Sequence, residues 1–397
     1  MSPDFEVLVA GHICLDIQPD LRGAGREPFE DTFLPGRLIA AGPVTCSTGG
    51  AVSNTGLALN KLGIMTHLAG KVGDDLFGRA IRQIVAIRGP RLADGMVVDA
   101  SASTSYSIII NYPGVDRIFL HYAGANDSFQ AGDVPYSLLE QTRLFHFGYP
   151  PVMRSTFING GAQLAEIFLR ARQTGVTTSL DMAFPDPSSE AGRADWRSIL
   201  GGTLPQVDLF LPSVEEILFM LHGKTYQEMC RSASGSDILA LVTPQMLSDL
   251  GRELISMGAK IVGLKLGDRG MYLRTGGRDA INSIGRVRPS NPDAWAGVEL
   301  WAPCFKVAVA GTTGSGDASI AGFLAGLLRD LPVEQALTMA VAVGACNVEA
   351  ADALSGICTW EETSRRMANG WERHSLKLDA PGWQFDPANG LWRGPCT

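Results

Sequence analysis

Short apolar runs alternate with segments of helical periodicity along most of this chain, which is the pattern of an α/β protein. The apolar runs predict strands at residues 5–10, 66–72, 144–147, 177–180, 209–211 and 261–266. Apolar residues three and four positions apart predict helices at residues 53–62, 77–87, 157–174, 214–221, 244–256, 316–329 and 333–350. We therefore expect βαβ units around a mostly parallel sheet with helices on both faces.

Four regions depart from this alternation. Residues 101–124 have the pattern of a β-hairpin, and residues 12–48 are rich in Gly and Pro with strand-like patches. Together they predict a small second sheet that covers the main one as a lid. Residues 275–305 predict an extended excursion. The tail at residues 371–397 contains three tryptophans, and we expect it to pack on the body of a single domain that spans residues 1–397.

The composition agrees with a globular enzyme that has a large core, because the 397 residues are 45% hydrophobic and 19% charged. The net charge of −8 gives no electrostatic reason to expect nucleic acid or an anionic membrane as a partner. We find no signal-peptide pattern and no apolar run long enough to span a membrane, so we predict a cytoplasmic protein. The seven scattered cysteines form no C-x-x-C pair, which argues against a disulfide framework or a zinc site.

The most informative motif is Gly-Thr-Thr-Gly-Ser-Gly-Asp at residues 311–317, directly before an amphipathic helix. A helix N-terminus attracts anions through its unpaired amides and the positive end of its dipole. Gly314, Ser315 and Gly316 contribute such amides, and Asp317 is a carboxylate in the first turn. Amides for the migrating charge, beside one base for the acceptor proton, are what phosphoryl transfer to a hydroxyl requires. A P-loop is excluded, because G-x-x-x-x-G-K-[ST] is absent.

A second glycine-rich helix start lies near residue 50. Gly49 and Gly50 precede a predicted helix, and Asn54 falls on the buried stripe of that helix in its first turn. Asp16 follows the first strand. Open α/β sheets bind ligands beyond the carboxyl ends of their strands, so these residues are candidates to bind a polyol. The alternatives are a buried, hydrogen-bonded asparagine and a turn-forming aspartate.

Two further patterns follow predicted strands. Glu216 is a candidate magnesium ligand, and the alternative is a solvated glutamate on a helix face. The segment from Lys265 through Gly267 to Gly270 ends a buried strand in a tight turn. Alone it indicates a hairpin, but beside a nucleotide its glycines would pass under the phosphates. The six histidines show no metal-ligand spacing, and we interpret them as structural.

The order of these motifs resembles the ribokinase (PfkB) family of sugar and nucleoside kinases over roughly residues 5–360. The resemblance implies a ribokinase-like three-layer α/β/α fold with a β-sheet lid, and ATP and Mg²⁺ as cofactors. It implies that Asp317 is the catalytic base, that residues 314–316 form the anion hole, and that Glu216 acts through magnesium. The implied sugar contacts are Asp16, Gly49, Gly50 and Asn54. The implied nucleotide-side residues are Lys265, Gly267, Gly270, Thr312 and Asn347.

Three residues depart from the family pattern. Ser213 lies where the family commonly has Asn before the magnesium-linked glutamate, and Ala183 replaces an Asn that often follows a strand-end Asp. Gly311 replaces an Asp in a segment that helps relatives bind a monovalent cation. The need for such a cation is therefore in doubt, while the base and the anion hole are retained.

The resemblance predicts an ATP-dependent kinase that phosphorylates a hydroxyl of a small sugar. One alternative is a nucleoside kinase, which would need aromatic stacking residues in the lid, for which Tyr106, Phe119 and Tyr122 are candidates. The other alternative is a regulator that binds a sugar and has lost phosphoryl transfer. The lid is also a candidate surface for a homodimer.

Overall fold

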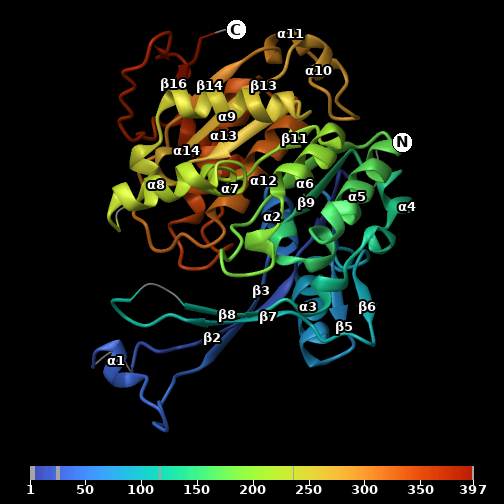
Figure 1. Ribbon diagram of the computed structural model, residues 1–397, viewed down its shortest axis with the longest axis vertical. Helices are drawn as coiled ribbons and strands as arrows, with labels where there is room; N and C mark the ends of the chain where they lie inside the picture. The colour runs from blue at the N-terminus through green and yellow to red at the C-terminus, as the bar shows by residue number, and fades with distance from the viewer. Residues whose placement is uncertain (1–4, 24–26, 116–117, 236, 396–397) are drawn as a thin grey trace.

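The computed structural model describes residues 5–23, 27–115, 118–235 and 237–395. The predicted lid ranges include residues 24–26 and 116–117, and the predicted tail includes residues 396–397, which lie outside the described residues. The chain forms a large sheet between two helical layers, and a smaller sheet lies below this body in Figure 1. The predicted α/β class, with a mostly parallel main sheet and a second small sheet, is confirmed.

The main sheet has the order β15-β16-β14-β13-β12-β11-β10-β9-β1-β4. The strands from β4 to β12 run parallel, and the pairings beyond β12 are antiparallel. The strands of this sheet are β1 (Val7–Gly11), β4 (Thr66–Ala69), β9 (Leu144–Gly148), β10 (Thr177–Asp181), β11 (Leu209–Phe210), β12 (Ile261–Lys265), β13 (Met271–Thr275), β14 (Glu299–Ala302), β15 (Gln384–Asp386) and β16 (Leu391–Arg393).

Two helical layers cover the main sheet because its central strands are apolar on both faces. In β1, Val7 and Val9 pack toward one layer, whereas Leu8 and Ala10 pack toward the other. The first layer contains α2 (Ala51–Lys61), α3 (Leu76–Arg88), α10 (Arg278–Asn282), α11 (Pro292–Trp295), α12 (Ser315–Leu328) and α13 (Val333–Asn347). The second layer contains α5 (Ala162–Gln173), α6 (Trp196–Thr203), α7 (Val214–Leu221), α8 (Gly223–Ala233) and α9 (Pro244–Ser256).

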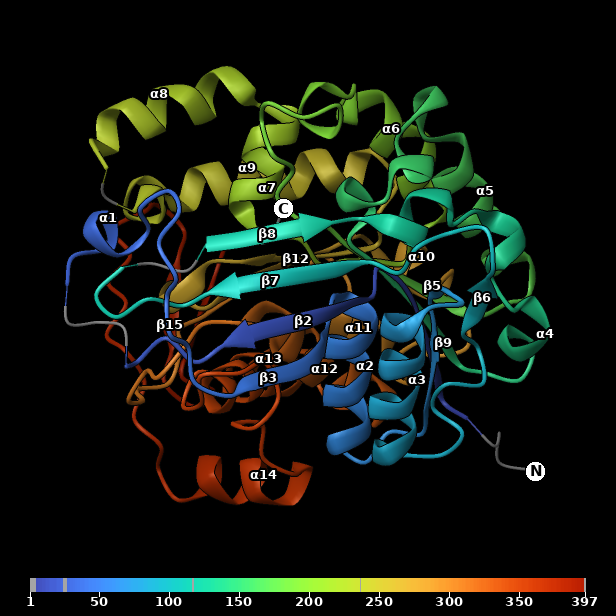
Figure 2. The same cartoon turned by 90° about the horizontal axis from the view of Figure 1, so that it is seen from below.

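The small sheet has the order β3-β2-β7-β8, and Figure 2 shows its four strands side by side. Its strands are β2 (Cys14–Pro19), β3 (Val44–Gly49), β7 (Tyr106–Ile110) and β8 (Ile118–Tyr122). Asp75 links this sheet to the body: its side chain accepts a hydrogen bond from Gly78 N (2.8 Å) at the start of α3 and from Thr104 N (2.7 Å) just before β7. The remaining elements are α1 (Phe29–Thr32), β5 (Lys71–Gly73), β6 (Val97–Asp99), α4 (Tyr136–Leu139) and α14 (Trp360–Ala368).

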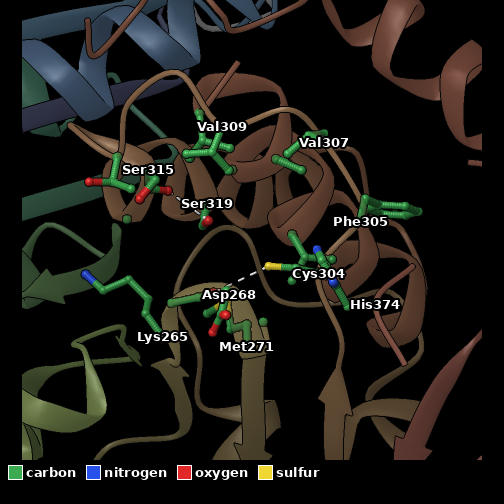
Figure 3. A pocket seen from close by; sticks show the side chains of 18 residues that line it. Lys265, Asp268, Met271, Cys304, Phe305, Val307, Val309, Ser315, Ser319 and His374 are labelled. Carbon is green, nitrogen blue, oxygen red and sulfur yellow. Dashed lines mark hydrogen bonds between the residues drawn. The ribbon is translucent and has the colours of Figure 1, made fainter. Parts of the chain in front are cut away.

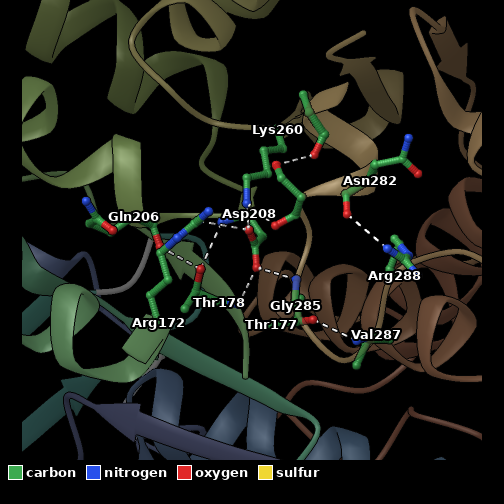
Figure 4. A network of polar contacts seen from close by, with 12 residues as sticks. Arg172, Thr177, Thr178, Gln206, Asp208, Lys260, Asn282, Gly285, Val287 and Arg288 are labelled. Carbon is green, nitrogen blue, oxygen red and sulfur yellow. Dashed lines mark hydrogen bonds and ion pairs between the residues drawn. The ribbon is translucent and has the colours of Figure 1, made fainter. Parts of the chain in front are cut away.

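A buried ionic network, shown in Figure 4, lies at the amino edge of the main sheet, where Asp208 and Lys260 directly precede β11 and β12. The candidate site lies at the opposite, carboxyl ends of the strands. The Asp208 carboxylate pairs with Lys260 and with Arg172 (3.4 Å) and accepts hydrogen bonds from Thr178 N (3.0 Å) and Gly285 N (3.3 Å). Asp208 is buried, so this set of donors compensates the cost of desolvating its charge.

Three sequence predictions differ from the structure. The helix expected at residues 157–174 begins at residue 162, because Gly160 and Gly161 have left-handed φ angles of 66° and 76° that end a helix. The stretch at residues 275–305 is not an extended excursion, since it contains α10, α11 and β14. In the tail, β15 and β16 extend the main sheet beyond β14, a pairing that the packing prediction did not include.

No helix in the described ranges is long and apolar enough to cross a bilayer.

Candidate active site

Asp317 lies at the start of α12, where the helix meets the carboxyl edge of the main sheet. Gly314, the residue before the helix, has a left-handed φ of 72°, and a Cβ there would come within 2.7 Å of Ala353 Cβ. Only glycine fits both demands. The turn that follows buries the Asp317 carboxylate at 3% exposure in the first turn of α12, where backbone amides generally lack partners within the helix.

Three side chains donate hydrogen bonds to the Asp317 carboxylate. Asn54 Nδ2 and the Tyr149 hydroxyl donate to Oδ2 at 3.1 and 2.7 Å, and Thr55 Oγ1 donates to Oδ1 at 3.0 Å. Burial and the negative charge of Asp317 raise the pKa of Tyr149 well above its ordinary value, so the phenol remains a proton donor. The sequence predicted Asp317 and Asn54 as site residues, but it gave no reason to select Thr55 or Tyr149.

The junction between β3 and α2 leaves no room for side chains. A Cβ at Gly49 would lie 2.2 Å from Asp16 Oδ2, and a Cβ at Gly50 would lie 2.5 Å from His12 Nδ1. Gly50 also has a φ of 85°, in the left-handed region. The structure therefore brings Asp16, Gly49 and Gly50 together one helical turn from Asn54.

The lid presents a polar row on the same face as Asp16. Across the strands, Asp16 pairs with Ser107 and Ser107 pairs with His121, and the Ser107 hydroxyl lies 3.0 Å from His121 Nδ1. Burial raises the pKa of Asp16 to about 6, while hydrogen bonds from Cys14 and Ser107 oppose this rise. A partly buried carboxylate with few donors is suited to accept hydrogen bonds from sugar hydroxyls.

His12 and His121 lie in this site, although the spacing of the histidines in the sequence predicted structural roles for them. The two rings are 5.2 Å apart, and the His12 ring is 6.3 Å from that of Tyr149. Burial, with a smaller effect of His121, lowers the pKa of His12 to about 3. Both ring nitrogens of His12 are buried without a hydrogen-bond partner among the described residues. Such nitrogens are available to a bound polar ligand.

A cavity of about 220 Å³ opens on the other side of the α12 N-terminus (Figure 3). Its lining includes the predicted residues Lys265, Gly267, Gly270 and Thr312, together with Ser315 and Gly316. Asn347 is not part of this lining: it is fully buried, and its amide nitrogen donates to the Ala353 carbonyl at 2.7 Å. Asn347 therefore holds the loop that packs on Gly314.

Lys265 connects the cavity with the carboxylates. Its Nζ lies 2.6 Å from Asp181 Oδ1, and a Cβ at Gly316 would be 3.3 Å from its Cδ and 3.5 Å from its Nζ. Burial and the carboxylates of Glu216 and Asp317 raise the pKa of Asp181 to about 8, against the opposing effect of Lys265. The lysine therefore places a positive charge beside the amides at which a phosphate would bind. Asp181 was not among the predicted site residues.

Glu216 is held by helix capping. Its Oε2 accepts from Ser213 N (2.7 Å), and its own amide donates to Ser213 Oγ (3.2 Å), a reciprocal capping box. In the described ranges no group of three or more His, Cys, Asp or Glu side chains has metal-site geometry. Mg²⁺ commonly uses only one or two carboxylates together with substrate phosphates and water. Glu216 and Asp181, whose buried Oδ2 has no partner among the described residues, fit that arrangement.

Gly311 packs against the backbone of the neighbouring loop. A Cβ at this position would lie 2.9 Å from Ala351 Cα and 3.0 Å from its carbonyl oxygen. An aspartate at residue 311 would therefore require this loop to move. A monovalent cation stays a prediction of the family resemblance.

The model of the pfkB family of carbohydrate kinases matches residues 6–359 of this chain. The chain belongs to this family. One relative is the probable fructokinase-6, chloroplastic, of Arabidopsis thaliana, which is 25% identical over 325 residues, or 79% of this chain and 72% of the relative.

Solved structures of similar fold include the fructokinase with bound ATP from Xylella fastidiosa, with a TM-score of 0.66, 18% identity, and coverage of 92% of this chain and 98% of that one. Another is a protein from E. coli in complex with ATP and Mg²⁺, with a TM-score of 0.63, 18% identity, and coverage of 92% and 99%. These TM-scores show that the chain has the ribokinase-like fold. As a pfkB-family member, the chain is a carbohydrate kinase.

Proposed function

We propose that this pfkB-family kinase transfers the γ-phosphoryl group of ATP to a hydroxyl of a small sugar. The observation that carries the proposal is the position of Asp317. Its carboxylate accepts a hydrogen bond from Asn54, on the side where the sugar would bind. The adjoining residues Ser315 and Gly316 line the cavity on the other side. A base at the boundary between two sites is the geometry that transfer between two bound substrates requires.

In this reaction the sugar hydroxyl loses its proton to an oxygen of Asp317 as its oxygen bonds to the γ-phosphorus. The bond from that phosphorus to the β–γ bridging oxygen breaks, and ADP leaves with the electron pair. The amides of residues 314–316 and the charge of Lys265 stabilise the negative charge on the transferring group. Mg²⁺, held by the phosphates near Glu216 and Asp181, would supply further neutralising charge.

A sugar acceptor agrees better with the lid than a nucleoside does. Tyr106 and Tyr122 pair with each other on the face of the lid opposite to Ser107 and His121, because successive residues of a strand point to opposite faces. Of the three candidate stacking residues, Phe119 alone lies on the same face of the lid as His121, two positions away on β8. The relative and the solved structure named as fructokinases make fructose the first sugar to test.

The direct test measures ADP release with ATP and Mg²⁺ across pentoses, hexoses including fructose, ketoacid sugars and nucleosides, with thermal-shift binding in parallel. We expect ADP release that depends on one or a few of the sugars. Release that depends on a nucleoside would favour the nucleoside kinase, and a thermal shift without ADP release would favour the sugar-binding regulator.

We also propose a homodimer through the lid, because the side chains of β8, including Phe119 at 53% and Leu120 at 53% exposure, are left open to solvent. Light scattering on the purified protein tests this proposal. The cytoplasmic location stays a prediction.

A further inference from the structure

The segment at residues 371–374 lies beyond the stretch that matches the family model, which ends at residue 359. It pairs antiparallel with residues 304–306, which follow β14. The Lys306 amide donates to the Glu372 carbonyl (2.8 Å), and the His374 amide donates to the Cys304 carbonyl (2.8 Å). This pairing fixes His374 directly beside the segment that closes one end of the cavity.

Contacts between aromatic and cationic side chains stabilise this pairing. The Trp371 ring stacks on Phe305 with 4.4 Å between centroids, and Trp371 Nε1 donates to the Lys306 carbonyl (2.9 Å). The guanidinium of Arg366 lies 3.7 Å from the centre of the Trp371 ring, and that of Arg373 lies 4.5 Å from the centre of Phe305. Stacking and cation–π contacts of this kind favour one conformation of the segment.

The cavity has two chemically different ends (Figure 3). Lys265 and Ser315 lie at one end, beside the α12 amides, whereas Cys304, Phe305 and His374 lie at the other. Apolar side chains such as Val307 and Val309 line the wall between them. A nucleotide has the same polarity, with an anionic phosphate chain at one end and a flat, largely apolar base at the other. The phosphates match the Lys265 end, so the base falls at the His374 end.

We infer that His374 is a nucleotide-binding residue, and that the C-terminal segment completes the base end of the cavity. This inference rests on the proposed kinase function. His374 lines the cavity, its side chain is exposed, and its imidazole has no hydrogen-bond partner in the described part of the chain. A planar ring that is fixed through its backbone and free at its side chain can stack on a base without rearrangement.

His374→Ala tests the assignment. We expect the KM for ATP, and the Kd for ATP measured by calorimetry, to rise about tenfold, the size typical of one lost base-stacking contact. The KM for the sugar and the kcat at saturating ATP should stay within about twofold of the parent, because His374 lies away from Asp317. Gln384→Ala is the matched control, since Gln384 lies exposed on β15 in the same tail and outside the cavity.

A second variant separates stacking from folding. His374→Phe retains a flat ring and should keep the KM for ATP within about threefold of the parent. Deletion of the tail is not a usable test, because β16 pairs with β14 and Leu391 is fully buried.

An unchanged Kd for ATP in a folded His374→Ala protein would overturn the inference. So would an equal loss of affinity in His374→Phe and His374→Ala. A parent protein that binds no ATP and releases no ADP with any sugar would instead overturn the proposed function.

Discussion

Asp317 is the residue on which turnover should depend most. Asn54, Thr55 and Tyr149 fix its carboxylate without neutralising it, so a base of the right shape is presented to the acceptor hydroxyl. Asp317→Asn keeps this shape and removes the basicity. We expect kcat to fall by about 10²–10⁴, with sugar affinity largely intact, as measured by coupled ADP release and calorimetry.

Asp249→Asn provides a control for this substitution. Asp249 is exposed on α9, where its carboxylate accepts hydrogen bonds from Gln245 and Arg252. It is not a residue of the candidate site, so turnover should not change in this variant. Near-normal turnover of Asp317→Asn would contradict the role of Asp317 as the base.

Lys265 should act on the transferring phosphoryl group and on stability together. Lys265→Met retains the apolar stem but removes the charge beside Gly316, and we expect kcat to fall by about 10²-fold. It also leaves the buried Asp181 carboxyl without its partner. Because the pKa of Asp181 is already raised to about 8, the carboxyl is protonated at neutral pH, and we expect the fold to be destabilised by about 1–3 kcal/mol, the cost of an unsatisfied buried polar group.

The double variant Lys265→Met/Asp181→Asn tests the stability effect by itself, because it removes both members of the ion pair. We expect it to recover much of the stability lost in Lys265→Met, as measured by urea unfolding. Equal stability of the single and double variants would show that the unpaired Asp181 is not the cause of the loss. Turnover does not distinguish these variants, because Asp181 is also a candidate magnesium ligand.

At the scale of single elements, the capping box at the N-terminus of α7 includes the candidate metal ligand Glu216. Ser213→Ala removes the hydroxyl that caps Glu216 N, and we expect a loss of about 1 kcal/mol in the free energy of unfolding. Ser213→Asn retains a good cap and should unfold within about 0.5 kcal/mol of the parent. Equal stability of all three proteins in urea titrations would show that the capping box contributes little.

The elements that the sequence predicted best have strong local signals. Both α7 and α9 have the predicted bounds, since Ser213 and Thr243 cap them and their apolar residues keep helical spacing. The later strands were harder to predict. The pairing of β16 with β14 joins residues about ninety positions apart in the chain, and no local pattern in a three-residue strand reports such a partner.

The residues of the candidate site also differ in how far a local pattern predicts them. Gly50, Asn54 and Asp317 were predicted because the glycines that mark a helix start stand within a few residues of the polar side chains. Tyr149 and His12 follow ordinary strands, and their meeting depends on the pairing of β1 with β9. Asn347 carries no conformational signal that distinguishes a ligand contact from a buried loop anchor, and the structure places it at such an anchor.

At the scale of the whole molecule, buried neutral histidines should make the fold sensitive to acid. His146 is fully buried in β9, with Nδ1 3.0 Å from the Ser179 hydroxyl. Burial, with a smaller effect of Lys265, lowers its pKa to about 3. Burial lowers the pKa of His12 to about 3 as well. Below about pH 6.5 the unfolded chain therefore binds protons at both histidines that the folded chain does not bind.

The sign of the effect follows from this difference in bound protons. The stability that each neutral histidine contributes is present above pH 6.5 and is lost as the pH falls toward 3, by about 1.4 kcal/mol per pH unit for each histidine. Urea unfolding of the parent and of His146→Asn at pH 6.0, 5.5, 5.0 and 4.5 isolates the contribution of His146, because Asp16 and Asp181, with pKa values raised to about 6 and about 8, contribute with the opposite sign in both proteins. The slope of the free energy of unfolding against pH should be lower by about 1.4 kcal/mol per pH unit in His146→Asn than in the parent, whatever constant loss the substitution adds. Equal slopes in the two proteins would mean that His146 takes up its proton in the folded state, and that the charge is accommodated inside the sheet.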